Sequence, residues 1–246
     1  QLGPRANDYE VATLSSWLMF RGGPSRNEGT LGGSPMLEPR WRVPTAIEPQ
    51  TEDMVQQQQR SYVDNEITVL PASHPLIVND VVLMRTTSNL LAVDFQTGKR
   101  VWEVPLESEL TELLNLGDSN SPQRNQQQFS QFIDQRTWDD ATYGTLSSDG
   151  DYVFSIEDLG LGLSANMQSP RMAIVGFNGR RRPLPTYPTP FNRLTAHDVR
   201  TGKLKWELGG PTGDLELELA GSFFLGAPLP LAGKLYALIE QNAEIR

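Results

Sequence analysis

The sequence predicts an all-β protein built from four-stranded antiparallel sheets. Three observations support this prediction. Glycine and proline are frequent, at 21 and 18 of 246 residues, and such residues favour turns and short strands over long helices. Short β-branched segments alternate with turn residues, and one twelve-residue segment occurs twice. Hydrophobic residues make up 38% of the chain, which is enough to form a core.

Composition and charge exclude several classes of site. The formal net charge of −9 argues against nucleic-acid binding, for which a basic stripe is expected. The absence of cysteine excludes disulfides, thiolate metal sites and a cysteine nucleophile. No apolar run approaches the roughly 18 residues of a membrane span. The start at Gln1 is neither a signal peptide nor an initiator methionine, so we expect a processed form or a piece of a longer protein.

Residues 1–66 are predicted to lead into the sheets. An apolar segment at 17–20 precedes a glycine-rich loop at 21–29, and prolines bound a short predicted strand at 40–43. The polar segment 48–66 is predicted to hold a helix at about 52–64, because its few apolar residues share one helical side.

The β pattern begins at residue 67. The short segments that predict strands in this region are 67–70, 76–78, 81–85, 90–94 and 100–104.

Residues 107–138 interrupt the strand pattern. Ser108 is a predicted N-cap of a helix at 108–114. The Gln-rich segment 115–128 is predicted to be a surface loop, and after it Phe129, Phe132 and Ile133 follow at helical spacing, with Arg136 as a further member.

Strands are then predicted at 143–147 and 152–156, joined by the turn signal Ser148-Asp149-Gly150. The proline-rich segment 159–191 is predicted to be extended or irregular. Further strands are predicted at 193–198, 204–208, 223–225 and 235–239.

The internal repeat is the most informative feature. Residues 92–103 and 196–207 align without a gap. The matching pairs that define the repeat are Ala92 and Ala196, Asp94 and Asp198, Thr97 and Thr201, Gly98 and Gly202, and Trp102 and Trp206.

Each position that matches between the two copies has a physical reason. Asp94 or Asp198 ends one strand and can accept backbone hydrogen bonds across the following turn. The glycine supplies a positive φ that other residues adopt only at a cost. Trp102 or Trp206 lies on the returning strand with a large apolar face and one N–H that needs an acceptor. The small alanine leaves room for a ring from a neighbouring sheet.

This pattern resembles the tryptophan-docking motif Ala-x-Asp-x-x-Thr-Gly-x-x-x-Trp of pyrroloquinoline-quinone-type (PQQ-like) repeat proteins. The resemblance implies a β-propeller of four-stranded antiparallel blades, in which the tryptophan wedges between successive blades. The segments 17–23 and 40–42 resemble the lead-in that such large exported bacterial proteins have before their first blade.

The resemblance implies a partial ring of about two and a half blades at 67–246. Blade one would span 68–106 and blade two 142–209, with insertions at 107–141 and 159–191 on the propeller faces, and blade three would start within 220–246. We expect the remaining blades beyond Arg246 or in another chain, because a propeller has about 4–8 blades. Residues 40–43 are then a candidate closing strand of the final blade.

Few residues are candidates for chemistry. Asp139, Asp140, Glu157 and Asp158 are weak metal-site candidates, with strand-end or N-cap roles as the alternative. Arg180, Arg181 and Arg182 are a candidate loop for an anion or a partner, with a solvated loop as the alternative. His74 and His197, the two histidines, are interpreted as structural, and no Gly-x-Ser-x-Gly motif accompanies them. No catalytic residue is assigned.

The resemblance leaves three functional interpretations. The first is a non-catalytic scaffold or protein-interaction domain in the bacterial cell envelope, periplasmic or secreted, with protein partners and no cofactor. The second is part of a quinoprotein dehydrogenase that uses pyrroloquinoline quinone and Ca²⁺. This chain lacks the adjacent cysteines that many such enzymes place beside the quinone. The third is a glycan- or protein-binding propeller within a larger protein.

Overall fold

The computed structural model describes residues 16–29, 38–46, 48–105, 122–157, 174–175, 181–182, 191–211, 218–241 and 244–245. This part of the protein is mostly β, with antiparallel four-stranded sheets and few helices, as the composition predicts. No sheet closes on itself within the described ranges. None of the helices found there is long and apolar enough to cross a membrane.

The first sheet is an antiparallel meander of four consecutive strands. Its strands are β1 (Leu76–Val78), β2 (Val81–Arg85), β3 (Asn89–Asp94) and β4 (Arg100–Pro105), in that spatial order. The predicted strand at 67–70 is wrong, because this segment has no strand conformation, pairs with no strand among the described residues and leads into Pro71. The backbone N–H of Ala72 instead donates to the carbonyl of Thr137 at 2.8 Å.

The second sheet repeats this arrangement. Its strands are β5 (Ser147–Ser148), β6 (Tyr152–Glu157), β9 (Arg193–Asp198) and β10 (Leu204–Gly209), and neighbours in this order are antiparallel. The turn signal at 148–150 does join two strands, but β5 is much shorter than the predicted strand 143–147. The first part of that segment is helical instead, because Asp140 caps a short helix there.

Smaller β elements complete the described chain. The third sheet contains β11 (Phe223–Phe224), β14 (Ile239–Gln241) and β15 (Glu244–Ile245). Two hairpins stand apart from it: β12 (Leu229–Leu231) with β13 (Lys234–Tyr236), and β7 (Ile174–Val175) with β8 (Arg181–Arg182).

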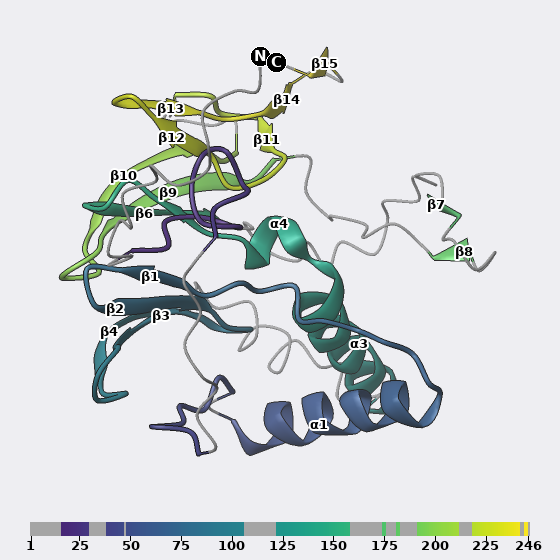
Figure 1. The fold of residues 1–246 in the computed structure, drawn as a ribbon. Coiled ribbons are helices and arrows are strands. Elements are labelled where there is room, and N and C mark those ends of the chain that lie inside the picture. Colours follow the sequence, from purple (N-terminus) through teal and green to yellow (C-terminus); the bar gives the residue numbers. More distant parts are fainter. Residues whose placement is uncertain are drawn as a thin grey trace, which may run out of the picture.

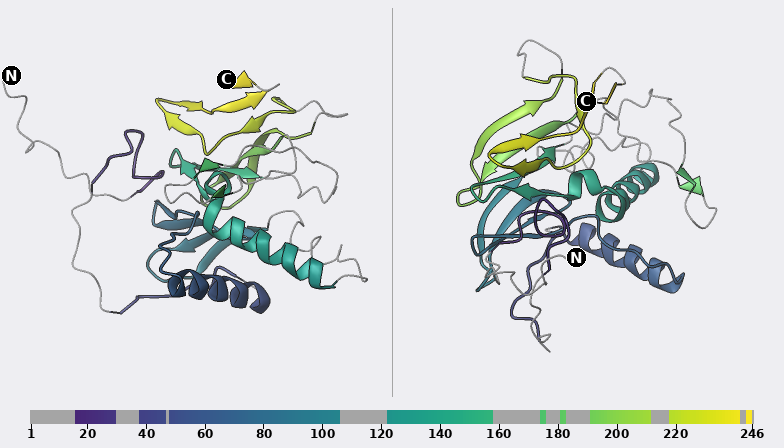
Figure 2. Two further views of the ribbon diagram at one scale, coloured as in Figure 1. Left: turned by 90° about the vertical axis from the view of Figure 1, so that its right-hand side faces the viewer. Right: turned by 45° about the horizontal axis from the view of Figure 1, so that its top comes forward.

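The three sheets are stacked in chain order, as Figures 1 and 2 show. One apolar core lies between the first and second sheets, and it includes Leu83, Trp102 and Val153. A second core lies between the second and third sheets, where Phe154 and Phe224 are buried. Each sheet therefore buries one face against the next, and burial of apolar area is what holds the stack together.

A segment of the lead-in joins the first two sheets. Trp17 forms an antiparallel bridge with Ile77 of β1, and Met19 forms one with Ser147 of β5. The N–H of Ser148 also donates to the carbonyl of Leu18 at 2.8 Å. The apolar segment at 17–20 thus pairs with the first strand of both sheets.

Helices pack beside the stack (Figure 1). They are α1 (Pro49–Asp64), α3 (Pro122–Asp134), the π-helix η1 (Gln135–Asp139) and α4 (Ala141–Gly144). The helix predicted at 52–64 is confirmed, and its Met54 and Val55 pack against Phe129, Phe132 and Ile133 of α3.

The loop predicted at 115–128 is wrong from Pro122 onward, where α3 begins. Proline is favoured at the first turn of a helix, and glutamine is a good helix former. The apolar residues at helical spacing then give this helix a face to bury. The helix predicted at 108–114 lies outside the described residues.

Candidate functional site

The two copies of the repeat form the same turn. Asp94 Oδ1 accepts hydrogen bonds from the backbone N–H of Thr97 at 2.7 Å and from its hydroxyl at 2.6 Å. Asp198 Oδ1 accepts the equivalent pair from Thr201, at 2.8 and 2.9 Å. Because the hydroxyl and then the backbone N–H of the threonine stabilise the carboxylate, the pKa of each aspartate is held below its ordinary value.

The glycine of each turn has the positive φ that the sequence predicted. Gly98 and Gly202 both have φ +70°. The strand that follows is also alike in the two copies: Ala92 lies opposite Trp102 and Ala196 opposite Trp206, each beside a register shift that leaves one residue unpaired. Such a bulge bends the strand and re-aims the side chain next to it.

Trp102 docks on the turn of the second repeat. Its indole Nε1–H donates to the carbonyl of Val199 at 2.8 Å, and its side chain belongs to the core between the first and second sheets. A Cβ placed on Gly202 would lie only 2.7 Å from the ring. The glycine therefore serves two purposes, because it adopts a positive φ and it lets the indole approach the backbone.

Trp41 of the lead-in docks on the turn of the first repeat in the same way. Its Nε1–H donates to the carbonyl of Phe95 at 2.9 Å, and Phe95 is the counterpart of Val199 in the repeat. A Cβ on Gly98 would lie 2.5 Å from the Trp41 ring. Residues 40–43 pair with no described strand, so this segment contacts the first sheet through side chains: the Trp41 indole, and Arg40, whose Nη1 donates to Gln96 Oε1 at 2.9 Å.

Trp206 lies on the far side of the second sheet. It is partly buried, packs against the core shared with the third sheet, and its ring lies 5.8 Å from that of Phe154. The tryptophans at 41, 102 and 206 thus lie at successive levels of the stack, and the indoles of Trp41 and Trp102 contact equivalent turns.

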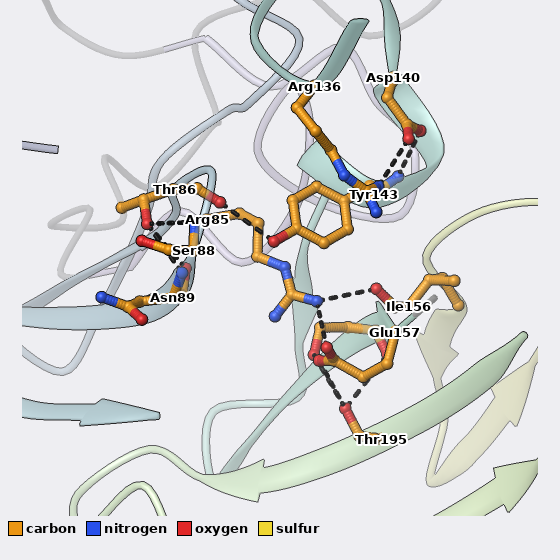
Figure 3. A network of polar contacts seen from close by, with 11 residues as sticks. Arg85, Thr86, Ser88, Asn89, Arg136, Asp140, Tyr143, Ile156, Glu157 and Thr195 are labelled. Carbon is orange, nitrogen blue, oxygen red and sulfur yellow. Dashed lines mark hydrogen bonds and ion pairs between the residues drawn. The ribbon is translucent and has the colours of Figure 1, made fainter. Parts of the chain in front are cut away.

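A buried polar network lies at one end of the strands (Figure 3). Arg85, at the end of β2, has a fully buried side chain whose Nη2 lies 2.6 Å from Glu157 Oε2 and donates to the carbonyl of Ile156 at 2.9 Å. Burial opposes the charge of this guanidinium, but the adjacent Glu157 carboxylate and Tyr143 together outweigh that effect, so the pKa of Arg85 is raised.

A second arginine completes this network. Arg136 of η1 pairs with Asp140 at 2.8 Å, and both side chains are almost fully buried. The ring of Tyr143 is contacted by both guanidiniums, with Arg136 Cζ 3.7 Å and Arg85 Cζ 4.3 Å from the ring centroid. The Tyr143 hydroxyl donates to the carbonyl of Thr86 at 3.1 Å, which ties α4 to the turn between β2 and β3.

The structure does not bring the four acidic candidates together as one cluster. Asp140 is the N-cap of α4, accepting from the Tyr143 N–H at 3.0 Å, and it pairs with Arg136, whereas Glu157 pairs with Arg85. Asp139 lies in η1, and Asp158 lies outside the described residues. No group of three or more metal-ligating side chains gathers within the described ranges.

The arginine candidates fall in the segment predicted to be irregular. Arg181 and Arg182 form β8, which pairs with β7 as a two-stranded hairpin, whereas Arg180 lies outside the described residues.

The two histidines occupy different environments. His74 lies before β1, where its ring contacts Phe20 edge-on at 4.8 Å. His197 is buried near the end of β9, at the position that Val93 occupies in the first repeat. Burial disfavours the imidazolium and lowers the pKa of His197, although the nearby Glu157 opposes this shift.

We expect the variant His197→Val to reduce the loss of stability on acidification. Unfolded chains protonate this histidine near its ordinary pKa of 6.5, whereas the folded state, with its lowered pKa, resists protonation. The free energy of unfolding therefore falls as the pH drops below that value, by at most about 1.4 kcal/mol per pH unit. Urea unfolding of both proteins at several pH values measures the difference, and parallel stability curves would contradict it.

Sequence reasoning did not identify Trp41, Arg85, Arg136 or Tyr143 as site residues. Trp41 had a usable signal, since it lies on a short alternating segment like Trp102. Arg85 had no such sequence signal. It ends strand β2 at the position where the second sheet has Ile156, and an arginine at the end of a strand is usually interpreted as exposed to solvent.

No protein-family model matches this chain, and no curated protein matches it either.

Proposed function

We propose that this chain is part of a β-propeller of the pyrroloquinoline-quinone-repeat type that acts as a non-catalytic, protein-binding scaffold in the bacterial cell envelope. The observation that carries the proposal is the equivalence of Trp41 and Trp102. Each indole donates its N–H to the residue after the turn aspartate, at 2.9 and 2.8 Å, and each packs against the turn glycine.

This equivalence supports a ring because successive sheets are then joined by the same tryptophan-to-turn contact. The second turn receives a tryptophan from the preceding sheet, and the first turn receives one from the lead-in. In a ring the sheet before the first one is the last one, so we propose that residues 40–43 belong to the final blade. The remaining blades are proposed to come from the same full-length protein or from another chain.

A scaffold role is supported by how the described polar groups are used. The buried carboxylate of Asp140 and the partly buried carboxylate of Glu157 are both paired with arginines. Rigid stacked sheets also hold α1, α3 and the connecting turns in fixed positions on one side (Figure 2), and binding residues are often placed on such connections. Protein partners in the periplasm or outside the cell are part of the same proposal.

The test uses the full-length protein. We expect no dye reduction with a panel of alcohols and aldoses after addition of pyrroloquinoline quinone and Ca²⁺, and we expect in-cell cross-linking followed by affinity purification to recover the same envelope proteins in each replicate. Electron microscopy of the same sample checks for a closed ring.

The controls separate the alternatives. The dye assay is repeated with quinone alone and with Ca²⁺ alone, and the purification is repeated with an unrelated exported protein that carries the same tag. Turnover that requires both quinone and Ca²⁺ would replace the scaffold proposal with a dehydrogenase. Recovery of glycans without proteins, or an open stack of sheets in the images, would also overturn it.

A further inference from the structure

A pocket of about 760 Å³ lies where the segments that enter three successive levels of the stack meet. His74 precedes β1, Thr145 precedes β5 and Ala227 precedes β12, and all three line the pocket. Each of them is only half-buried, so a ligand can reach it. The lead-in contributes Met19 and Phe20 to the wall. The volume lies in the range of ligand sites, about 300–1,000 Å³.

Hydrogen bonds hold these walls together. The Ser147 hydroxyl donates to the carbonyl of Pro228 at 2.6 Å, which joins β5 to the segment before β12. The backbone N–H of His74 donates to the carbonyl of Gly144 at 3.3 Å, which joins the segment before β1 to α4. The pocket is therefore formed without a ligand, and this lowers the cost of ordering on binding.

The pocket is long because its walls come from three levels. Stacked sheets pack about 10 Å apart, so walls from three levels extend over about 20 Å. An extended chain advances about 3.3 Å per residue, so about six peptide residues match this length. Phe20 remains 37% exposed on the open side. An open, elongated hollow suits a segment of a larger partner better than a small molecule, whose site usually encloses most of its surface.

Only part of the wall belongs to the outer face of the third level. Tyr236 also lines the pocket, and it pairs with Leu229 as Leu83 pairs with Leu76 in the first sheet, where Leu83 is buried in the core shared with the second sheet. A further sheet would cover Tyr236 in the same way. Phe20 bonds to neither strand of that hairpin and lies in the lead-in segment that pairs with β1 and β5, so it is not on that face.

Gly226 borders open space at this pocket. Its φ lies outside the left-handed region, and a Cβ placed on it would meet no atom within 4 Å. Neither the backbone nor the packing of the described residues therefore requires glycine at this position. Glycine is commonly found where a ligand approaches the backbone closely, and the bare wall here leaves room for the main chain of a bound peptide.

The pocket carries positive charge, whereas the chain has a formal net charge of −9. Arg26 is the only Lys, Arg, Asp or Glu in the described lining, and it is exposed and forms no ion pair within the described ranges. Arg21 adds a second cation, with Cζ 5.4 Å from the ring centroid of Phe20. Glu28, the acidic residue of the same loop, does not line the pocket. Accessible guanidiniums beside an apolar wall favour a partner with acidic residues next to apolar ones.

We propose that this pocket binds an extended peptide segment of a partner protein, in which apolar side chains are flanked by acidic residues. The apolar side chains pack against Phe20 and Leu225, the acidic residues pair with Arg26 and Arg21, and the main chain passes Gly226. This inference rests on the protein-binding role proposed above and names the site and the chemistry of the partner.

The experiment is equilibrium capture of pooled peptides of about seven residues by the immobilised full chain, followed by mass spectrometry. One pool has apolar residues at the centre and acidic residues at both ends. A second pool has basic ends, and a third has serine in place of the apolar residues. We expect members of the first pool to bind in the micromolar range, less tightly as the salt concentration rises, and the other two pools not to bind.

Gly226→Leu fills the pocket and should weaken binding by about ten-fold or more, because the ligand is then overpacked. Gly29→Leu is the matched control, since a Cβ on Gly29 also meets no atom within 4 Å but Gly29 lies outside the pocket. Arg26→Gln should weaken binding by about three-fold. Arg60→Gln, at an exposed arginine of α1, should leave it unchanged. Circular dichroism confirms that each variant is folded.

Several outcomes would overturn this proposal: no binding by the acidic pool, equal binding by the acidic and basic pools, or binding unchanged by Gly226→Leu. Dimerisation of the chain that Gly226→Leu abolishes would assign the pocket to a second copy instead. In-cell cross-linking with Gly226→Leu separates this site from the scaffold role. If the variant recovers the same partners as the wild type, only the site is wrong, whereas if the wild type recovers none, the proposed function fails as well.

Discussion

Replacing Trp102 by alanine is expected to lower the free energy of unfolding by about 3–5 kcal/mol, the range typical for removing a buried large aromatic side chain. Trp102 is 9% exposed, lies in the core between the first and second sheets, and donates a hydrogen bond to Val199. Its loss opens a cavity and leaves that carbonyl without its donor. Chemical unfolding followed by circular dichroism measures the change.

Trp206→Ala is the matched control for this prediction. It has the same residue type at the same repeat position, but its side chain is only partly buried, so we expect a smaller loss of stability. Trp102→Phe keeps much of the apolar area and removes the N–H, so its cost should lie between wild type and Trp102→Ala. An equal or larger effect of Trp206→Ala would show that the Trp102 contact is not what couples the two sheets.

Gly202→Ala is the second change with a large expected effect. At φ +70° an L-residue costs about 1–2 kcal/mol. The new methyl group would also lie 2.7 Å from the Trp102 ring, and such overpacking costs a further about 1–3 kcal/mol. Thermal and urea unfolding of the variant give the total.

Gly233→Ala separates the two contributions. Gly233 has nearly the same φ, +73°, but no atom lies within 4 Å of the Cβ position. This variant should therefore show the backbone cost alone. If Gly202→Ala and Gly233→Ala lower the free energy of unfolding equally, the Trp102 ring does not lie in tight contact with Gly202, and their contact is looser than the structure indicates.

The strands and turns of this protein could be predicted from local signals. Predicted segments of three to six residues between turn residues marked most of the strands in the first two sheets. The repeat marked both turns, because a carboxylate acceptor, a threonine donor and a glycine at positive φ act within five residues. Those interactions are local, so the sequence order already contains them.

Prediction failed where a local preference competes with a distant contact or a cap. The β-branched segment 67–70 has the composition of a strand, but no strand in the described part of the chain pairs with it. Tyr143 has strand propensity too, yet capping by Asp140 and the contacts of Tyr143 with two arginines place it in α4. Propensity is a weak guide when tertiary contacts oppose it.

The sequence by itself determined the antiparallel β class, the helix within the lead-in and the two turns of the repeat, since each depends on residues close together in the chain. Only the tertiary structure decided that Trp41 occupies the turn at Gly98 and that Arg85 reaches Glu157, 72 positions further along. The physical reason is that these contacts join segments that come together only when whole sheets stack. Stacking is driven by burial of apolar area, which is non-directional, so the local sequence does not show which distant residue will be the partner.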